Sequence, residues 1–175
     1  MGSHVVSYKG KKGVSFMVWA PNAKCVYLSG EFNNWSIDSH PMTNLYHSGV
    51  WGIFIDNLSE GEKYKYNVIG CDGISRLKSD PYATFSELRP NTASVVYDIG
   101  NYEWSDNKWQ ECKSKKICDN EPMNIYEVNL GSWKRKWDGG FFSYEELYEM
   151  LDYAKDMGYT HIEIMPITEY PLDMS

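Results

Sequence analysis

The sequence predicts a mainly β protein: an immunoglobulin-like β-sandwich, then a connector, then an incomplete (β/α)8 barrel that consists of one β-α-β unit. Short apolar runs separated by turn residues recur between residues 14 and 98, which is typical of a sandwich. From residue 124 the pattern becomes that of a strand, an amphipathic helix and a second strand. We therefore expect a sandwich over residues 1–102, a connector over 103–121 and the β-α-β unit over 122–175.

Five strands are expected in the sandwich. They are VSFMVW (14–19), KCVYLS (24–29), VWGIFI (50–55), KYKYNVI (63–69) and ASVVYD (93–98). Alternation is clearest in the fourth, so one side of that strand should face the core and the other the solvent. The expected inward residues are Tyr64, Tyr66 and Val68, and the expected outward residues are Lys63, Lys65 and Asn67.

The connector is expected from a change in composition. Residues 103–121 are polar and charged and lack a clear period, yet they carry Trp104 and Trp109. We expect the two indoles to dock this segment onto a neighbouring part of the protein.

A helix that starts at Ser143 is the clearest element of the second half. Ser143 and Glu146 have the spacing of a capping box, in which each side chain accepts from the backbone amide of the other residue. Phe142 and Leu147 supply a hydrophobic staple, and Gly158 is placed to end the helix. The expected apolar stripe consists of Leu147, Met150, Leu151, Ala154 and Met157.

The helix joins two expected strands, NIYEVNL (124–130) and THIEIMP (160–166). Ile162 and Ile164 should pack on one face of the second strand. Parallel strands are stable when both faces of their sheet are covered, and a single β-α-β unit cannot cover both. The sequence is therefore expected to be the front of a longer protein, in which the open barrel edge favours self-association.

Composition limits the classes of partner and cofactor. The net charge is −7 and the basic residues are scattered, so no nucleic acid partner is expected. The sequence has neither an apolar run of about eighteen residues nor a secretory signal, so we expect a soluble, cytoplasmic protein with no membrane partner. The four cysteines show no CxxC spacing, so we expect no metal, cofactor or disulfide.

The loop from Gly30 to Trp35 is a candidate glycan-binding surface. It combines the adjacent amides of Asn33 and Asn34 with an indole. Amides suit neighbouring sugar hydroxyls, and an indole suits the apolar face of a pyranose. Lys65, on the outward side of its strand, could add a hydrogen bond. The alternative is that the asparagines only form the turn, that Trp35 anchors it to the sandwich, and that Lys65 is a solvated lysine.

Paired carboxylates are the signature of glycosidic chemistry. Glu127 and Glu163 lie within the two strands of the β-α-β unit, and Glu169 and Asp173 follow the second strand. Barrel catalysts project from the C-terminal ends of strands, so we interpret the first two as structural residues and the last two as parts of a loop. His161 and Glu163 are interpreted as a structural pair. No catalytic residue is expected in this chain.

Several segments together resemble known families. VWAPNA (18–23), VYLSGEFNNW (26–35), GVWGIFI (49–55), GEKYKY (61–66), SDPYA (79–83) and ELRPNTASVVYD (87–98) resemble the carbohydrate-binding module of family 48, in the form found in 1,4-α-glucan branching enzymes. EPMNIYEVNLGSWKRK (121–136) and residues 143–173 are similar to the start of the catalytic barrel of glycoside hydrolase family 13.

The resemblance implies an enzyme of glycogen biosynthesis that acts on an α-glucan. Such an enzyme cleaves an α-1,4 bond, holds the chain as a covalent glycosyl intermediate and rejoins it through an α-1,6 bond. The resemblance also implies that the catalytic carboxylates lie beyond Ser175, so the fragment should be inactive. A non-catalytic glycogen-binding module, and another family 13 enzyme such as a debranching enzyme or a trehalose-forming hydrolase, are the alternatives.

The same resemblance bears on the glycan surface. In related glycogen-binding modules of kinase regulatory subunits, a tryptophan and a lysine that match Trp35 and Lys65 contact glucose. A second stacking tryptophan of those modules would fall at residues 72–75, where this chain has Asp-Gly-Ile-Ser.

Overall fold

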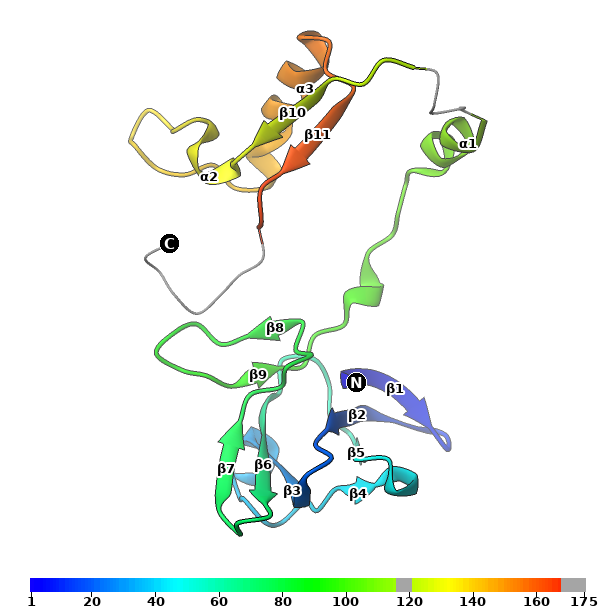
Figure 1. The fold of residues 1–175 in the computed structure, drawn as a ribbon, viewed down its shortest axis with the longest axis vertical. Helices are drawn as coiled ribbons and strands as arrows, with labels where there is room; N and C mark the ends of the chain where they lie inside the picture. Colours follow the sequence, from blue (N-terminus) through cyan, green and yellow to red (C-terminus); the bar gives the residue numbers. More distant parts are fainter. Residues whose placement is uncertain (116–120, 168–175) are drawn as a thin grey trace. The chain divides into compact units, whose positions relative to one another are not determined.

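The structure, a computed structural model, describes residues 1–115 and 121–167. The chain divides into two compact units, Met1–Glu103 and Trp104–Ser175, whose elements are labelled in Figure 1. The first unit is the predicted β-sandwich. In the described part of the chain, no helix has the length and apolar character needed to cross a bilayer.

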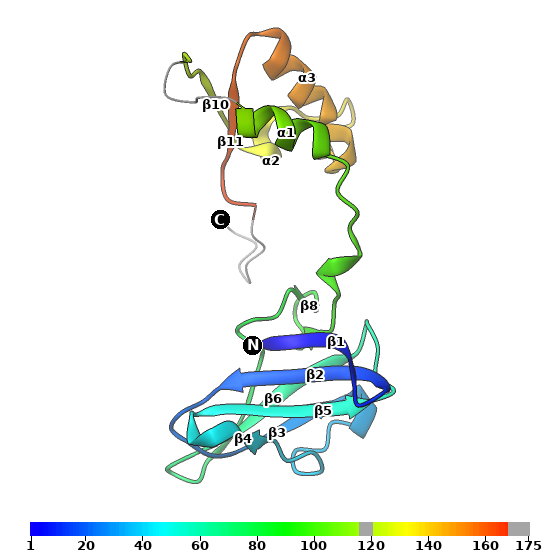
Figure 2. The same cartoon turned by 90° about the vertical axis from the view of Figure 1, so that its right-hand side faces the viewer.

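Two antiparallel sheets form the layers of the sandwich. One has the strand order β1-β2-β5-β4, and the other has the order β3-β6-β9-β8, with β7 paired to β6. Figure 2 shows β1, β2 and β5 side by side in the first sheet. The strands are β1 (Gly2–Tyr8), β2 (Lys11–Trp19), β3 (Ala23–Gly30), β4 (Thr43–Asn44), β5 (Val50–Asp56), β6 (Lys63–Gly70), β7 (Ser75–Lys78), β8 (Phe85–Ser86) and β9 (Ser94–Val95), and the 3-10 turns are η1 (Glu31–Asn33), η2 (Leu45–His47) and η3 (Ile99–Asn101).

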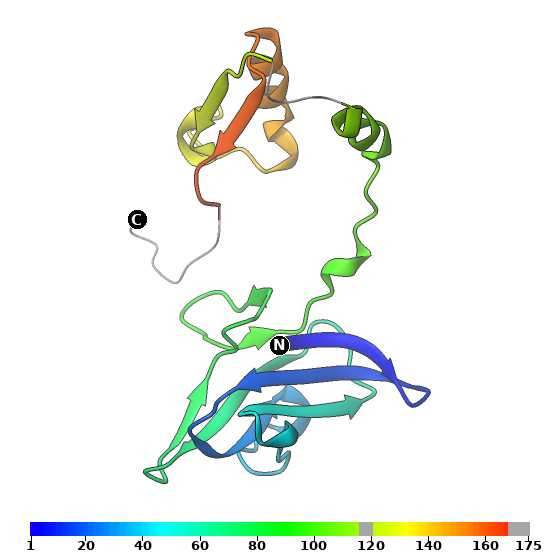
Figure 3. The same cartoon turned by 45° about the vertical axis from the view of Figure 1, so that its right-hand side comes forward.

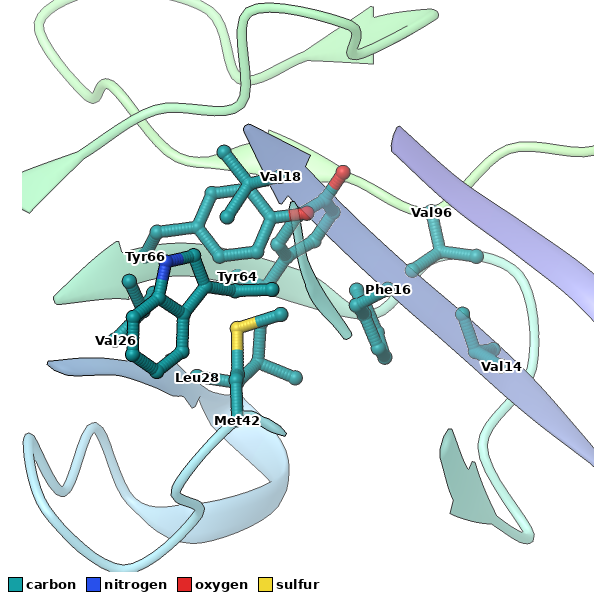
Figure 4. Close-up of a cluster of buried hydrophobic side chains, with 10 residues drawn as sticks. Val14, Phe16, Val18, Val26, Leu28, Met42, Tyr64, Tyr66 and Val96 are labelled. Carbon is teal, nitrogen blue, oxygen red and sulfur yellow. The ribbon is translucent and has the colours of Figure 1, made fainter. Parts of the chain in front are cut away.

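The core lies between the two sheets, because alternate residues of each strand point inward. Phe16 of β2 and Tyr64 of β6 are both fully buried, and their rings meet edge to face with centroids 4.8 Å apart. Tyr66 is also fully buried, as its period of two predicted. Figure 4 shows this cluster. Its other buried members are Val14, Val18, Val26, Leu28, Met42, Trp51 and Val96.

Two expectations for the sandwich are wrong. Asn67, expected to face the solvent, is 1% exposed. Its Nδ2 donates to the Ile37 carbonyl at 2.8 Å and its Oδ1 accepts from the Ser75 hydroxyl, because the loop after η1 and strand β7 cover that side of β6. The strand expected over residues 93–98 extends only over Ser94–Val95, since the chain then leaves the sheet and Val96 donates to the Glu62 carbonyl.

The β6–β7 hairpin ends in an exposed ion pair. Arg76 donates to Asp72 at 2.7 Å, and the Ile74 amide donates to the same carboxylate at 3.0 Å. The Arg76 hydrogen bond, followed by that of the Ile74 amide, lowers the pKa of Asp72 to about 2. A lowered pKa means that the ionised carboxylate stabilises the hairpin above its ordinary pKa of about 3.9, and that this contribution is lost as the pH falls towards 2.

We expect Arg76→Ala to raise the pKa of Asp72 towards its ordinary value, because the largest cause of the shift is removed. An NMR titration of the Asp72 side-chain carboxyl carbon measures this. Lys78→Ala, which removes a cation from the same hairpin, is the control and should leave the Asp72 pKa low. An unchanged titration in Arg76→Ala would mean that the Ile74 amide alone sets the pKa.

The second unit contains the predicted β-α-β arrangement. Strands β10 (Ile125–Val128) and β11 (His161–Ile164) pair in parallel, and helix α3 (Tyr148–Asp156) connects them on one face, as Figure 3 shows. The loop after β10 contains α2 (Leu130–Trp133), and η5 (Glu145–Leu147) leads into α3. A further helix, α1 (Asn107–Lys115), lies within the expected connector and was not predicted. Its Trp109 is 57% exposed and lies beneath the Lys113 ammonium.

The predicted capping box starts the connecting helix. The Ser143 amide donates to Glu146 Oε2 at 2.7 Å, and the Glu146 amide donates to Ser143 Oγ at 3.4 Å. Lys136 lies 2.7 Å from the same carboxylate, and its hydrogen bond, with that of the Ser143 amide, lowers the pKa of Glu146. Gly158 has φ of +82° just after the helix, a conformation that glycine adopts without a steric penalty.

The apolar stripe of this helix is only partly buried. Its buried members are Leu147, Met150 and Ala154. Leu151 and Met157 were expected to be buried but are 42% and 59% exposed, and Ile164 of β11 is 44% exposed. A sheet of two strands is narrow, so it covers the middle of the stripe and leaves its margins in solvent.

Candidate functional site

The turn after β3 positions the predicted glycan-contacting residues. β3 ends at Gly30, where a Cβ would lie 2.4 Å from both the Lys63 carbonyl oxygen and the Phe32 ring. Only glycine fits this close approach of backbone and ring. The chain then turns through η1 towards Trp35.

The Asn33 side chain is engaged within the protein. Its Oδ1 accepts from the Gly30 amide at 2.9 Å. Its Nδ2 lies 3.0 Å from the Leu28 carbonyl, 3.1 Å from the Ser39 hydroxyl and 3.0 Å from His40 Nδ1. These contacts use both ends of the amide. In this structure Asn33 therefore forms the turn, which is one of the two roles expected for it.

The next two residues turn the indole outward. Asn34 and Trp35 have φ of 51° and 59°, which is uncommon for residues other than glycine. The Trp35 amide donates to the Gly30 carbonyl at 2.8 Å and closes the turn. The Trp35 side chain is 38% exposed. Asn34 is exposed as well but does not line the hollow that Trp35 borders.

That hollow is open and has a volume of about 470 Å³. The structure thus brings Trp35 and Lys65 together, leaves Asn33 and Asn34 outside, and adds a wall from residues 87–93 that the sequence analysis did not single out. The lining residues are Glu31, Trp35, Lys65, Glu87, Pro90, Asn91, Thr92 and Ala93.

A bridging lysine fixes the rim of the hollow. Lys63 Nζ lies 3.1 Å from a carboxylate oxygen of Glu31 and 3.1 Å from one of Glu87. Hydrogen bonds to these two carboxylates raise the pKa of Lys63. Glu87 also accepts from the Ala93 amide at 3.1 Å. The bonds join η1, β6 and the 87–93 segment.

Lys65 crosses the hollow to its far wall. Its ammonium donates to Thr92 Oγ1 at 2.6 Å. Ser29 pairs with Lys65 across β3 and β6, so the two side chains share one face of the sheet. Ser29 is fully buried, and its hydroxyl has no hydrogen-bond partner among the described residues. The hollow therefore combines an aromatic face with an ammonium, a hydroxyl and carboxylates, which suits a polyhydroxylated ligand.

Residues 72–75, where a second stacking aromatic would fall, form the tip of the β6–β7 hairpin. Ile74 is 54% exposed there, and Asp72 is paired with Arg76. The single indole of this platform is Trp35.

The carboxylates of the second unit are not arranged around a cleft. Glu127 and Glu163 are neighbours in register across β10 and β11, and both are exposed. The expected pair of His161 with Glu163 is not formed, because His161 Nδ1 lies 2.8 Å from the Thr160 hydroxyl instead. Glu169 and Asp173 lie outside the described residues. Over residues 1–115 and 121–167, His, Cys, Asp and Glu side chains form no group of three placed to hold a metal ion.

Sequence comparison relates the chain to proteins of α-glucan metabolism. Residues 1–83 match the family model described as Carbohydrate-binding module 48 (Isoamylase N-terminal domain). The chain is 49% identical over 178 residues to 1,4-alpha-glucan branching enzyme GlgB 2 of Clostridium perfringens (strain 13), covering 100% of this chain and 27% of that protein. It is 46% identical over 175 residues to GlgB of Bacillus subtilis (strain 168), covering 99% and 28%. The chain thus spans about a quarter of the length of these curated relatives.

Solved structures share the fold. Pullulanase from Bacillus acidopullulyticus matches with a TM-score of 0.67 and 20% identity, over 98% of this chain and 22% of that chain. The apo pullulanase from Klebsiella pneumoniae matches with a TM-score of 0.65 and 22% identity, over 96% of this chain and 20% of that chain. At these identities the likeness concerns the fold alone.

Proposed function

Because residues 1–83 belong to carbohydrate-binding module family 48, we propose that the chain is the N-terminal part of a 1,4-α-glucan branching enzyme. One observation carries the proposal: the 49% identity to a branching enzyme extends over the whole chain, through β10, α3 and β11, and is not confined to the module. A free glycogen-binding module has no use for a β-α-β unit. The same identity to branching enzymes favours branching over debranching.

The reaction would transfer a glucan chain from an α-1,4 to an α-1,6 position through a covalent glycosyl-enzyme. Such a reaction needs a carboxylate nucleophile and a carboxylic acid that protonates the leaving oxygen. Barrel enzymes carry these groups at the C-terminal ends of strands, whereas Glu127 and Glu163 lie within strands. We therefore assign this chain a binding and scaffolding role and expect it to be inactive by itself.

The hollow beside Trp35 supplies the binding role. Its indole can cover the apolar face of one pyranose. Lys65 and Thr92 can exchange their mutual hydrogen bond for bonds to sugar hydroxyls. The ion pairs of Lys63 hold the walls in place before a ligand arrives, so little conformational entropy is lost on binding.

The test is the activity of the full gene product on amylose. We expect it to raise the proportion of α-1,6 bonds, measured by proton NMR of the anomeric region, while the 175-residue chain leaves amylose unchanged. Pullulan serves as the second substrate. Cleavage of pullulan without branching of amylose would contradict the proposal and identify a debranching enzyme.

A further inference from the structure

Trp137 is an exposed indole held at the tip of a rigid turn. Its side chain is 99% exposed. The Lys136 amide donates to the Gly140 carbonyl at 3.0 Å, and the Gly139 amide donates to the Lys136 carbonyl at 2.9 Å. Asp138 Oδ1 accepts from the Gly140 amide at 2.8 Å. The turn is closed by its own bonds and does not depend on the indole.

The residues that flank Trp137 are tied down. Lys134 pairs with Glu149 of α3, and Lys136 pairs with Glu146 of η5. The Arg135 guanidinium lies 3.5 Å from the centroid of the Phe141 ring. Each basic side chain before the indole therefore has a partner in its own unit. Trp137 is left as a pre-positioned apolar surface, and such preorganisation lowers the entropic cost of binding.

The position of this turn indicates which kind of ligand it meets. It lies in the loop that follows the carboxyl end of β10, and β11 runs parallel to β10, so both strands end at the same edge. In β/α folds, ligands bind at the carboxyl ends of the parallel strands, on the loops that follow them. The indole of Trp137 therefore stands on the side where a barrel enzyme handles its substrate.

We propose that Trp137 is a second stacking platform for an α-glucan chain, at the edge of the sheet where β10 and β11 end. The ligand class rests on the proposed function, and the site is separate from the hollow at Trp35. An indole in water leaves a large apolar area uncovered, and covering that area is favourable. The apolar face of a pyranose can cover it and still keep its hydroxyls in water.

Maltoheptaose titrated into the whole chain tests this, with the indole N–H signals of Trp35 and Trp137 followed separately by NMR. We expect a saturable shift of the Trp137 signal and of the Gly139 amide. In Trp137→Ala, half-saturation of the Gly139 shift should need at least about fivefold more maltoheptaose, equivalent to about 1 kcal/mol. Trp137→Tyr should restore most of the response, and Trp109→Ala, which removes an indole from α1, should leave it unchanged.

A Trp137 signal that does not move overturns the inference. If Trp35 responds in that experiment, the proposed function stands and only the second platform is lost; if Trp35 is silent too, glycan binding by this chain is lost as well. A Trp137 signal that follows protein concentration and ignores maltoheptaose also overturns the inference, because the indole then contacts another copy of the chain.

Discussion

Replacement of Asp80 by alanine is expected to lower the free energy of unfolding of the sandwich by about 2–5 kcal/mol. Asp80 is 6% exposed, and one of its oxygens accepts from the hydroxyls of Tyr64 at 2.6 Å and Tyr66 at 3.1 Å. Its other oxygen accepts from the Tyr82 amide at 2.8 Å. Burial, with the added effect of the Asp80 carboxylate, raises the pKa of both phenols, so both remain donors. Alanine would leave two buried hydroxyls without an acceptor.

Urea denaturation followed by the NMR amide signals of β2 and β6 measures the effect on the first unit alone. Asp80→Asn keeps one acceptor and the volume, so its loss should be smaller than that of alanine. Asp56→Ala is the control, because Asp56 pairs with Lys11 on the surface and surface pairs contribute little. If Asp80→Ala is as stable as Asp56→Ala, the tyrosine hydroxyls have found other partners and the buried carboxylate is not an anchor.

Removal of the Trp35 indole is expected to weaken binding of maltoheptaose at the hollow by about tenfold or more, equivalent to about 1.4 kcal/mol. The indole is the one aromatic surface among the lining residues, and the remaining contacts are hydrogen bonds that compete with water. The amide shifts of Asn91 and Thr92 during a titration report the affinity of this site. Lys65→Met should weaken binding less, because it keeps the apolar stem of the side chain and loses only the ammonium.

Trp19→Ala is the matched control, since Trp19 is 61% exposed on β2 and lies outside the hollow. It should bind like the wild type, and the Trp137 response should be the same in every variant of the hollow. Equal affinity of Trp35→Ala and wild type would remove Trp35 from the site and leave it as an anchor of the turn.

The sequence predicted the strands that bury one full side. β2 and β6 have apolar inward residues at every second position, and this pattern results directly from packing in a closed core. β1 and β7 were missed because edge strands pair through their backbones and can keep both sides polar. In β7 the only apolar residue is Leu77, which is 47% exposed. The burial of Asn67 was missed for a different reason: its cover comes from a loop thirty residues earlier, which no local pattern records.

About half of the candidate site could be predicted. Trp35 and Lys65 were identified from their chemistry, and the structure places both on one hollow. Their binding of glycan stays a prediction. The wall at residues 87–93 was missed because it contributes short side chains and backbone, such as the Thr92 hydroxyl and the Ala93 amide. Lys63 was expected only to face solvent, since its two acidic partners lie far from it in the sequence.

The Asn33 contacts have a consequence for engineering and for natural variation. An alanine scan would score Asn33 as a ligand residue, because its loss would release the Gly30 amide and the Leu28 carbonyl and let the indole wander. That score would mislead a designer. Libraries meant to change ligand preference should keep Gly30 and Asn33 constant and diversify residues 90–92, where side chains border the hollow without holding the turn. By the same reasoning, homologues should drift at the wall while the turn stays the same.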